Sequence, residues 1–254
     1  MIIGIASGKG GVGKSTLTVN LGLALSDFGI KTMIVDANLT NGNLSCMLGT
    51  PLPKHSIQEV LLNRATLESA VFDHPRGVKL LSSALPLNEA FSVKPYHLKK
   101  LEVEELRKMA DVILFDTPGT LGENTMQAFG MADAVAIVTN HDVTSYTDAV
   151  KTRMFARKMD VEIIGAVLNK SRVSRKNAEK EVSSWLKMPL IGNIPFDRKI
   201  PESGENGIPP LHYNMVSDYS IEVKSLAAAI TGIRYKPPGR FERFIGRIFR
   251  RRKY

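Results

Sequence analysis

The stretch that decides the fold is GKGGVGKST, residues 8–16. It fits the pattern G-x-x-x-x-G-K-[S/T], and it lies between a short apolar run at 2–6 and a helical pattern at 17–28. Glycines at such a place let backbone N–H groups converge on phosphate oxygens, and the start of the helix adds the positive end of its dipole. The sequence therefore predicts a phosphate-binding loop.

The motif also assigns roles within the loop. Lys14 is expected to neutralise the charge of the β- and γ-phosphates, and the Ser15 hydroxyl is expected to bind Mg²⁺. The residues predicted to bind the nucleotide in this loop are Gly8, Lys9, Gly10, Gly11, Val12, Gly13, Lys14, Ser15 and Thr16.

The rest of the chain alternates apolar runs of strand length with longer helical patterns. Strands are predicted at 2–6, 31–36, 78–82, 112–116, 134–139, 161–169 and 190–195. Helices are predicted at 17–28, 56–62, 66–72, 95–109, 143–158, 174–186 and 218–230. Continuous Val/Ile/Leu strands separated by helices indicate an α/β fold: a single doubly wound, mostly parallel sheet with helices on both faces.

Composition excludes several classes of protein. The chain has 254 residues, of which 43% are apolar and 23% charged, as in an ordinary globular protein. One cysteine, Cys46, cannot form a disulfide framework, a cysteine zinc site or an iron–sulfur cluster within one chain, and it favours a reducing, cytoplasmic location. No run approaches the ~20 apolar residues of a membrane-spanning helix, so any membrane contact is expected to be peripheral.

The net charge of +9 is concentrated at the C-terminus. Between residues 236 and 254, eight basic residues stand against Glu242 alone, so most of the excess lies there. Pro237 and Pro238 interrupt any helix just before this segment. We therefore expect a main domain at 1–232, a linker at 233–239 and a basic tail at 240–254.

The tail has the pattern of an amphipathic helix. Five apolar residues recur at i, i+3, i+4, i+7 and i+8 and cover an arc of about 140°: Phe241, Phe244, Ile245, Ile248 and Phe249. Five arginines lie to one side of that arc: Arg240, Arg243, Arg247, Arg250 and Arg251. This pattern is typical of an interfacial membrane anchor for an anionic surface. Docking on the chain's own domain and binding to nucleic acid remain alternatives.

The loop carries an additional lysine, Lys9, and the string KGGVGKST resembles the deviant phosphate loop of the MinD/ParA ATPases. The resemblance covers about residues 1–232. It implies that the nucleotide is ATP with Mg²⁺. It also implies that the chain forms a homodimer in the ATP state, in which Lys9 reaches the phosphates bound by the partner chain.

Other segments extend the resemblance. VDANLT at 35–40 matches the first switch of the family, and ILFDTPG at 113–119 matches the Walker B strand and the second switch. These matches imply metal-site residues Ser15, Asp36 and Asp116. LNK at 168–170 and NIPFD at 193–197 resemble the two segments that hold the adenine, which implies roles for Asn169 and Pro195.

One position departs from the family pattern. The first switch usually reads Asp-x-Asp, but its second carboxylate is replaced here by Asn38. An amide can orient the attacking water but cannot accept its proton, so we expect slow hydrolysis. Together with Lys9 and Lys14, Asn38 is one of the three predicted catalytic residues.

Taken together, these observations predict a MinD-like ATPase switch whose tail resembles the membrane-targeting sequence of MinD-type members. It would bind the inner face of the cell membrane and position a machine such as the division apparatus through an unidentified cargo or activating protein. One alternative is a ParA-like partition ATPase that binds non-specific DNA, for which Lys170, Arg172, Arg175 and Lys176 form a second basic cluster. The other is a nucleotide-locked membrane scaffold with little turnover.

Overall fold

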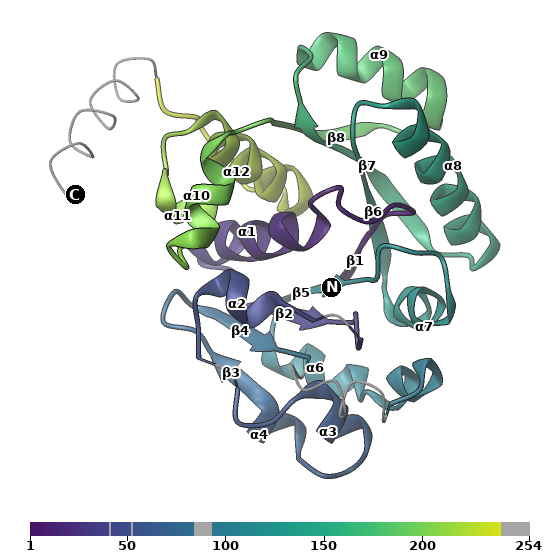
Figure 1. The fold of residues 1–254 in the computed structure, drawn as a ribbon, viewed down its shortest axis with the longest axis vertical. Helices are drawn as coiled ribbons and strands as arrows, with labels where there is room; N and C mark the ends of the chain where they lie inside the picture. Colours follow the sequence, from purple (N-terminus) through teal and green to yellow (C-terminus); the bar gives the residue numbers. More distant parts are fainter. Residues whose placement is uncertain (41, 52, 84–92, 240–254) are drawn as a thin grey trace, which may run out of the picture.

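The computed structural model describes residues 1–40, 42–51, 53–83 and 93–239, and one eight-stranded sheet forms its centre (Figure 1). The strand order is β3-β4-β2-β5-β1-β6-β7-β8. All neighbouring strands are parallel except β3 and β4, which pair antiparallel at one edge. The strands are β1 (Ile2–Ala6), β2 (Thr32–Asp36), β3 (Val71–Asp73), β4 (Val78–Leu81), β5 (Val112–Asp116), β6 (Ala134–Thr139), β7 (Glu162–Ser171) and β8 (Leu190–Pro195).

Helices cover both faces of this sheet, as the sequence predicts. One face packs against α1 (Lys14–Asp27), α2 (Leu44–Leu48), α11 (Pro210–Tyr213) and α12 (Asp218–Thr231). The other face packs against α3 (Ile57–Leu61), α4 (Leu67–Ala70), the 3-10 helix η1 (Pro95–Lys100), α6 (Val103–Met109), α7 (Glu123–Met131), α8 (Val143–Lys158) and α9 (Arg175–Leu186). Helix α10 (Lys199–Glu205) follows β8.

Alternation along the central strands builds two cores, because successive side chains of a strand point to opposite faces. Ile3 and Ile5 of β1 join the core under α1 and α12, whereas Ile2 joins the core on the opposite face. In β5, Leu114 likewise joins the core under α1 and α12, and Phe115 joins the core on the opposite face. Every residue of β1, β2 and β5 is buried, which explains why these strands are apolar apart from Thr32 and the terminal Asp36 and Asp116.

The topology brings the carboxyl ends of the parallel strands to one edge of the sheet. Asp36 at the end of β2 lies in register with Asp116 at the end of β5. Strand β1 lies between β5 and β6. From β1 the chain passes through α1 to β2 on one side, and from β5 it crosses to β6 on the other side of β1 through α7. In open α/β sheets, ligands bind at this kind of switch point.

The predicted helix at 95–109 is wrong in one respect, because it is broken. The chain forms η1 and then α6, with an extended backbone at Leu101. This break lets Leu98, Leu101 and Leu106 all enter the same core.

The predicted helix at 66–72 is also too long. It ends at Ala70, because Val71 begins β3 and pairs with β4. Among the residues that the structure describes, four short or glycine-containing helices were not predicted: α2, α7, α10 and α11.

In the described part of the chain, no helix combines the length and apolarity needed to cross a bilayer. The ten residues predicted to bind a membrane, from Arg240 to Arg251, lie outside the described residues.

Candidate nucleotide-binding site

The loop between β1 and α1 depends on glycine at Gly13. Its φ of 91° is in the left-handed region, and a Cβ there would lie 2.4 Å from Nδ2 of Asn169. Gly11 has a φ of 77° and is also in the left-handed region. Because L side chains rarely adopt this conformation, the turn into α1 requires glycine.

The first turn of α1 is arranged to accept an anion. Gly13 is the N-cap residue, and no side chain caps the helix there. The first turn also contains no acidic residue. Uncapped N–H groups at a helix N-terminus attract phosphate through hydrogen bonds and the helix dipole.

Directly beneath the loop, two of its side chains converge on one carboxylate. Lys14 Nζ donates to Oδ1 of Asp116 at 2.7 Å, and Ser15 Oγ donates to Oδ2 at 2.5 Å. The Lys14 and Asp116 side chains are only 7% and 3% exposed. A cation, a hydroxyl and a carboxylate therefore meet at the end of β5. The predicted roles of Lys14 toward phosphate, and of Ser15 and Asp116 toward Mg²⁺, stay predictions.

Asp36 provides a second buried carboxylate at the same edge. Its Oδ1 accepts a hydrogen bond from the backbone N–H of Asn38 at 3.1 Å, whereas Oδ2 has no hydrogen-bond partner among the described residues. Burial raises the pKa of Asp36 well above its usual range, and the negative charge of Asp116 raises this pKa further. Such a pair is stabilised by a cation.

These donors fit Mg²⁺. Magnesium prefers oxygen ligands and is typically held by one or two carboxylates together with substrate phosphates and water. Ser15, Asp36 and Asp116 supply a hydroxyl and two carboxylates at one edge, and Oδ2 of Asp36 is available as a ligand. Across the described residues, no group of three or more His, Cys, Asp or Glu side chains offers an all-protein metal cage.

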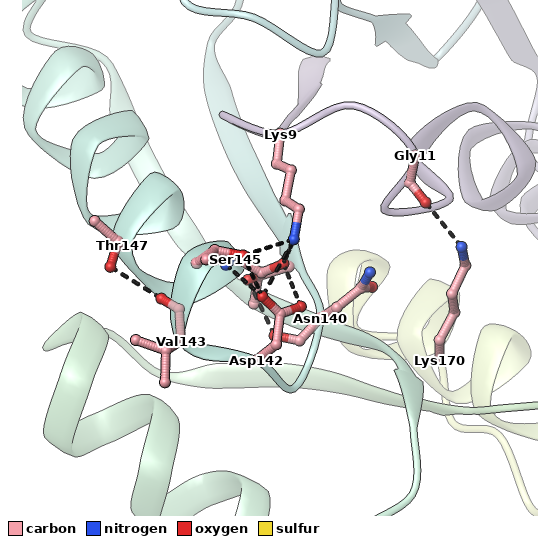
Figure 2. Close-up of polar contacts among 10 residues, drawn as sticks. Lys9, Gly11, Asn140, Asp142, Val143, Ser145, Thr147 and Lys170 are labelled. Carbon is pink, nitrogen blue, oxygen red and sulfur yellow. Dashed lines mark hydrogen bonds and ion pairs between the residues drawn. The ribbon is translucent and has the colours of Figure 1, made fainter.

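Lys9 points toward the start of α8, where Asp142 and Ser145 lie (Figure 2). Its Nζ lies 3.2 Å from Oδ1 of Asp142, 2.8 Å from Oγ1 of Thr144 and 3.1 Å from Oγ of Ser145. Hydrogen bonds from Ser145 and Thr144, with a further one from Lys9, hold the pKa of Asp142 well below its usual range. The predicted role of Lys9 needs a second chain and stays a prediction.

The end of β7 holds the phosphate loop through two side chains. Asn169 Nδ2 donates to the carbonyl oxygen of Val12 at 2.8 Å, and Lys170 Nζ donates to that of Gly11 at 2.8 Å. Figure 2 shows Lys170 reaching the loop from β7. Two carbonyls of the loop are thus held by β7, which leaves its N–H groups to face a ligand.

The first switch segment follows β2. Asn38 lines the same cavity as the loop, and its side-chain oxygen accepts a hydrogen bond from Thr40 Oγ1 at 3.4 Å. The amide thus lies where an attacking water could be oriented, although its predicted catalytic role stays a prediction.

The cavity beside the loop has a volume of about 710 Å³. Its walls include eight of the nine predicted loop residues, from Lys9 to Thr16, but not Gly8, Asp36, Asp116, Asn169 or Pro195. The carboxylates of Asp36 and Asp116 are buried and do not line the cavity, and Asn169 is only 5% exposed. The predicted adenine roles of Asn169 and Pro195 stay predictions.

Sequence reasoning identified only part of a further wall of the cavity. It is formed after β8 by Phe196, Asp197, Ile200, Pro201, Gly204 and Ile208. Arg172 lies over the Phe196 ring, with its guanidinium carbon 4.5 Å from the ring centroid. The NIPFD segment signals the first two of these residues. The short helix α10, which contains a proline and a glycine, gives no comparable pattern.

Comparison with known proteins supports this arrangement. A family model described as "ParA: NUBPL iron-transfer P-loop NTPase" matches residues 1–231. An uncharacterised ATP-binding protein of Methanocaldococcus jannaschii is 29% identical, over 98% of this chain and 97% of its own length.

Two solved structures are similar over almost their whole length. The cell division ATPase MinD of Pyrococcus furiosus is 33% identical with a TM-score of 0.84, over 92% of this chain and 99% of that one. The septum site-determining protein MinD of Pyrococcus horikoshii, complexed with Mg-ADP, is 32% identical with a TM-score of 0.85, over 92% and 98%. The predicted family and fold are confirmed.

The loop geometry predicts a selective effect of Gly13→Ala. The new Cβ must displace Asn169, and the left-handed backbone is strained, so unfolding should require ~1–3 kcal/mol less free energy. Gly10→Ala is the matched control, because no atom lies within 4 Å of its ideal Cβ. It should change stability by no more than ~1 kcal/mol. Urea denaturation measures the free energy of unfolding of both variants. Equal values for the two would contradict the requirement for glycine at position 13.

Proposed function

Because the chain belongs to the ParA family of P-loop NTPases, we propose that it works as a MinD-like switch that binds a membrane reversibly and positions a cellular machine such as the division apparatus. It is an ATPase, with ATP and Mg²⁺ as its cofactors. The proposal divides the chain into an ATPase domain at 1–232, a linker at 233–239 and a membrane-binding tail at 240–254.

One observation carries the proposal: Lys14 and Ser15 meet on Asp116 directly beneath a cavity walled by the phosphate loop. On nucleotide binding, the Lys14 ammonium would turn from Asp116 to the β- and γ-phosphates. Asp116 and Asp36 would then hold Mg²⁺ together with Ser15. Bound Mg²⁺ neutralises phosphate charge in such sites.

The reaction is attack of water on the γ-phosphorus of ATP, with release of ADP and phosphate. Lys14 stabilises the negative charge on the phosphate oxygens, and Lys9 of a second copy adds to this stabilisation. Asn38 orients the water through its side-chain amide. Because Asn38 cannot accept the proton of that water, turnover should depend on positioning and charge stabilisation and should be slow.

Dimer formation would require Lys9 to leave its present partners. Its contacts with Asp142, Thr144 and Ser145 are partly exposed, with the Lys9 side chain 37% exposed and that of Asp142 43% exposed. Exposed ion pairs contribute little stability, so phosphates bound by another copy can compete for this lysine. Two copies would then enclose two nucleotides.

The tail supplies the membrane contact in this proposal. Its apolar arc suits the boundary between headgroups and acyl chains, and its arginines suit an anionic surface at the inner face of the membrane. One such helix binds weakly, and two in a dimer gain avidity. ATP would thereby control attachment to the membrane, and a cargo or activating protein would bind the attached dimer.

Two observations weigh against other activities. In the second basic cluster, Lys170 binds the loop, Arg172 covers Phe196, and Arg175 pairs with Glu179 and Glu222. These internal contacts leave this cluster less suited to binding non-specific DNA.

Iron transfer, which appears in the family description, is not proposed, because Cys46 is the single cysteine of the chain.

Lys9→Ala should weaken the ATP-dependent dimer by ~10-fold or more while leaving nucleotide affinity within ~3-fold, because Lys9 would act across the interface. Light scattering with Mg²⁺ and a non-hydrolysable ATP analogue measures the dimer. Lys151→Ala is the control, since it removes an exposed lysine of α8 that pairs with Asp148. A monomer at every nucleotide state of the unmodified chain would count against the switch.

Asn38→Asp should raise steady-state ATP hydrolysis, by up to ~10²-fold, with little change in nucleotide affinity. A carboxylate can accept the proton that an amide cannot. Asn63→Asp makes the same change on an exposed turn after α3 and should leave turnover unaltered. Turnover by Asn38→Asp at or below that of the unmodified chain would show that this position does not limit hydrolysis. Negligible turnover by the unmodified chain would favour the scaffold alternative.

Phe244→Glu should abolish ATP-dependent recruitment to anionic vesicles while preserving ATP binding, because a buried phenylalanine contributes ~1.5–3 kcal/mol per tail. Met154→Glu adds the same charge at a side chain 62% exposed on α8 and should bind as the unmodified chain does.

Co-sedimentation with phosphatidylglycerol vesicles, and separately with DNA, decides between the membrane and partition functions. Full vesicle binding by Phe244→Glu would refute the anchor. Binding of the unmodified chain to DNA but not to vesicles would favour the partition ATPase.

A further inference from the structure

The segment after α12 folds back onto the helix that it leaves. Gly232 ends α12 with a left-handed φ of 73°, which turns the chain. Tyr235 then shares the wall of a small cavity, about 310 Å³, with Ser225, Ala228 and Ala229 of α12. These short side chains leave room for the tyrosine ring beside the helix.

Tyr235 also reaches α1. Its ring centroid lies 5.6 Å from that of Phe28, with the planes at 47°, a favourable tilted contact. Burial raises the pKa of Tyr235, and the negative charge of Glu222 raises it further. Its sequence neighbours Arg234 and Lys236 are exposed, so Tyr235 alone in this trio is turned inward.

Phe28 makes this contact informative, because it is the C-cap residue of the helix that starts at the phosphate loop. From Leu17 to Leu25 every residue of α1 is buried, so the helix is fixed within the core. A group attached at Phe28 is therefore attached to the rigid body that also carries Lys14.

We propose that Tyr235 is a positioning residue that pins the root of the tail to the end of α1, so that the tail leaves the domain from a fixed place. This inference rests on the proposed membrane-binding function. The tail is then tethered by residues 236–239 instead of the whole linker 233–239. Pro237 and Pro238 stiffen what remains.

A fixed root matters for attachment through two tails. The second tail of a dimer binds at an effective concentration that the tether sets, and a shorter, directed tether raises it. Releasing Tyr235 would leave three more residues to be ordered at every attachment. We expect this release to weaken ATP-dependent vesicle binding by ~3–10-fold, with ATP hydrolysis in the absence of lipid unchanged.

The test compares Tyr235→Ala with Tyr235→Phe, which keeps the ring against Phe28. The first readout needs no membrane: trypsin cleavage after Arg234, followed by mass spectrometry of fragment 1–234. A pinned linker resists cleavage, so Tyr235→Ala should be cut severalfold faster than the unmodified chain or Tyr235→Phe. The second readout is co-sedimentation of the full chains with phosphatidylglycerol vesicles and ATP.

The outcomes separate this inference from the function on which it rests. Equal cleavage rates for all three chains would overturn the pin. Faster cleavage but equal vesicle binding by Tyr235→Ala would overturn the positioning role and leave the proposed function standing. Absence of ATP-dependent vesicle binding by the unmodified chain would overturn the proposed function and the positioning role with it. The inference is supported if Tyr235→Ala is cleaved faster and binds vesicles more weakly, while Tyr235→Phe behaves as the unmodified chain does.

Discussion

The buried ion pair between Lys14 and Asp116 is the interaction on which the site depends. Its atoms lie 2.7 Å apart, and both side chains are almost fully removed from solvent. Charges in such surroundings are costly unless they are paired, and removing one partner typically destabilises a protein by ~3–5 kcal/mol. Because Lys14 opens α1 and Asp116 ends β5, the pair ties the phosphate loop to the sheet at the point where β1 and β5 are neighbours.

The remaining features complete a preorganised phosphate site around that pair. Asn169 and Lys170 hold loop carbonyls from β7, and an uncapped helix N-terminus faces the cavity. Asp36 lies in register with Asp116, and its pKa is raised by burial first and by the negative charge of Asp116 second. A bound Mg²⁺ would stabilise the charged form of both carboxylates, and phosphates would give Lys14 a new partner. Nucleotide and metal therefore stabilise the same edge.

Sequence patterns predicted the parts of this site that are local. The loop motif and the buried apolar strands were identified correctly because each depends on a few consecutive residues, and β1, β5, β6 and β8 begin and end where the apolar runs do. The partners of Lys9 and Asn169 were not predictable, since Asp142 is 133 residues from Lys9 and Asn169 is 157 residues from Val12. Nor did periodicity reveal the break at Leu101, which depends on where three leucines meet the core.

The central claim is that Lys14 and the carboxylates beneath it form one site for ATP and Mg²⁺. The most direct measurement is calorimetric titration of ATP into the unmodified chain and into Lys14→Ala, each with and without Mg²⁺. We expect tight binding that strengthens with Mg²⁺ in the unmodified chain, and a loss of at least ~10²-fold in affinity for folded Lys14→Ala. Undiminished affinity in Lys14→Ala would contradict the assignment.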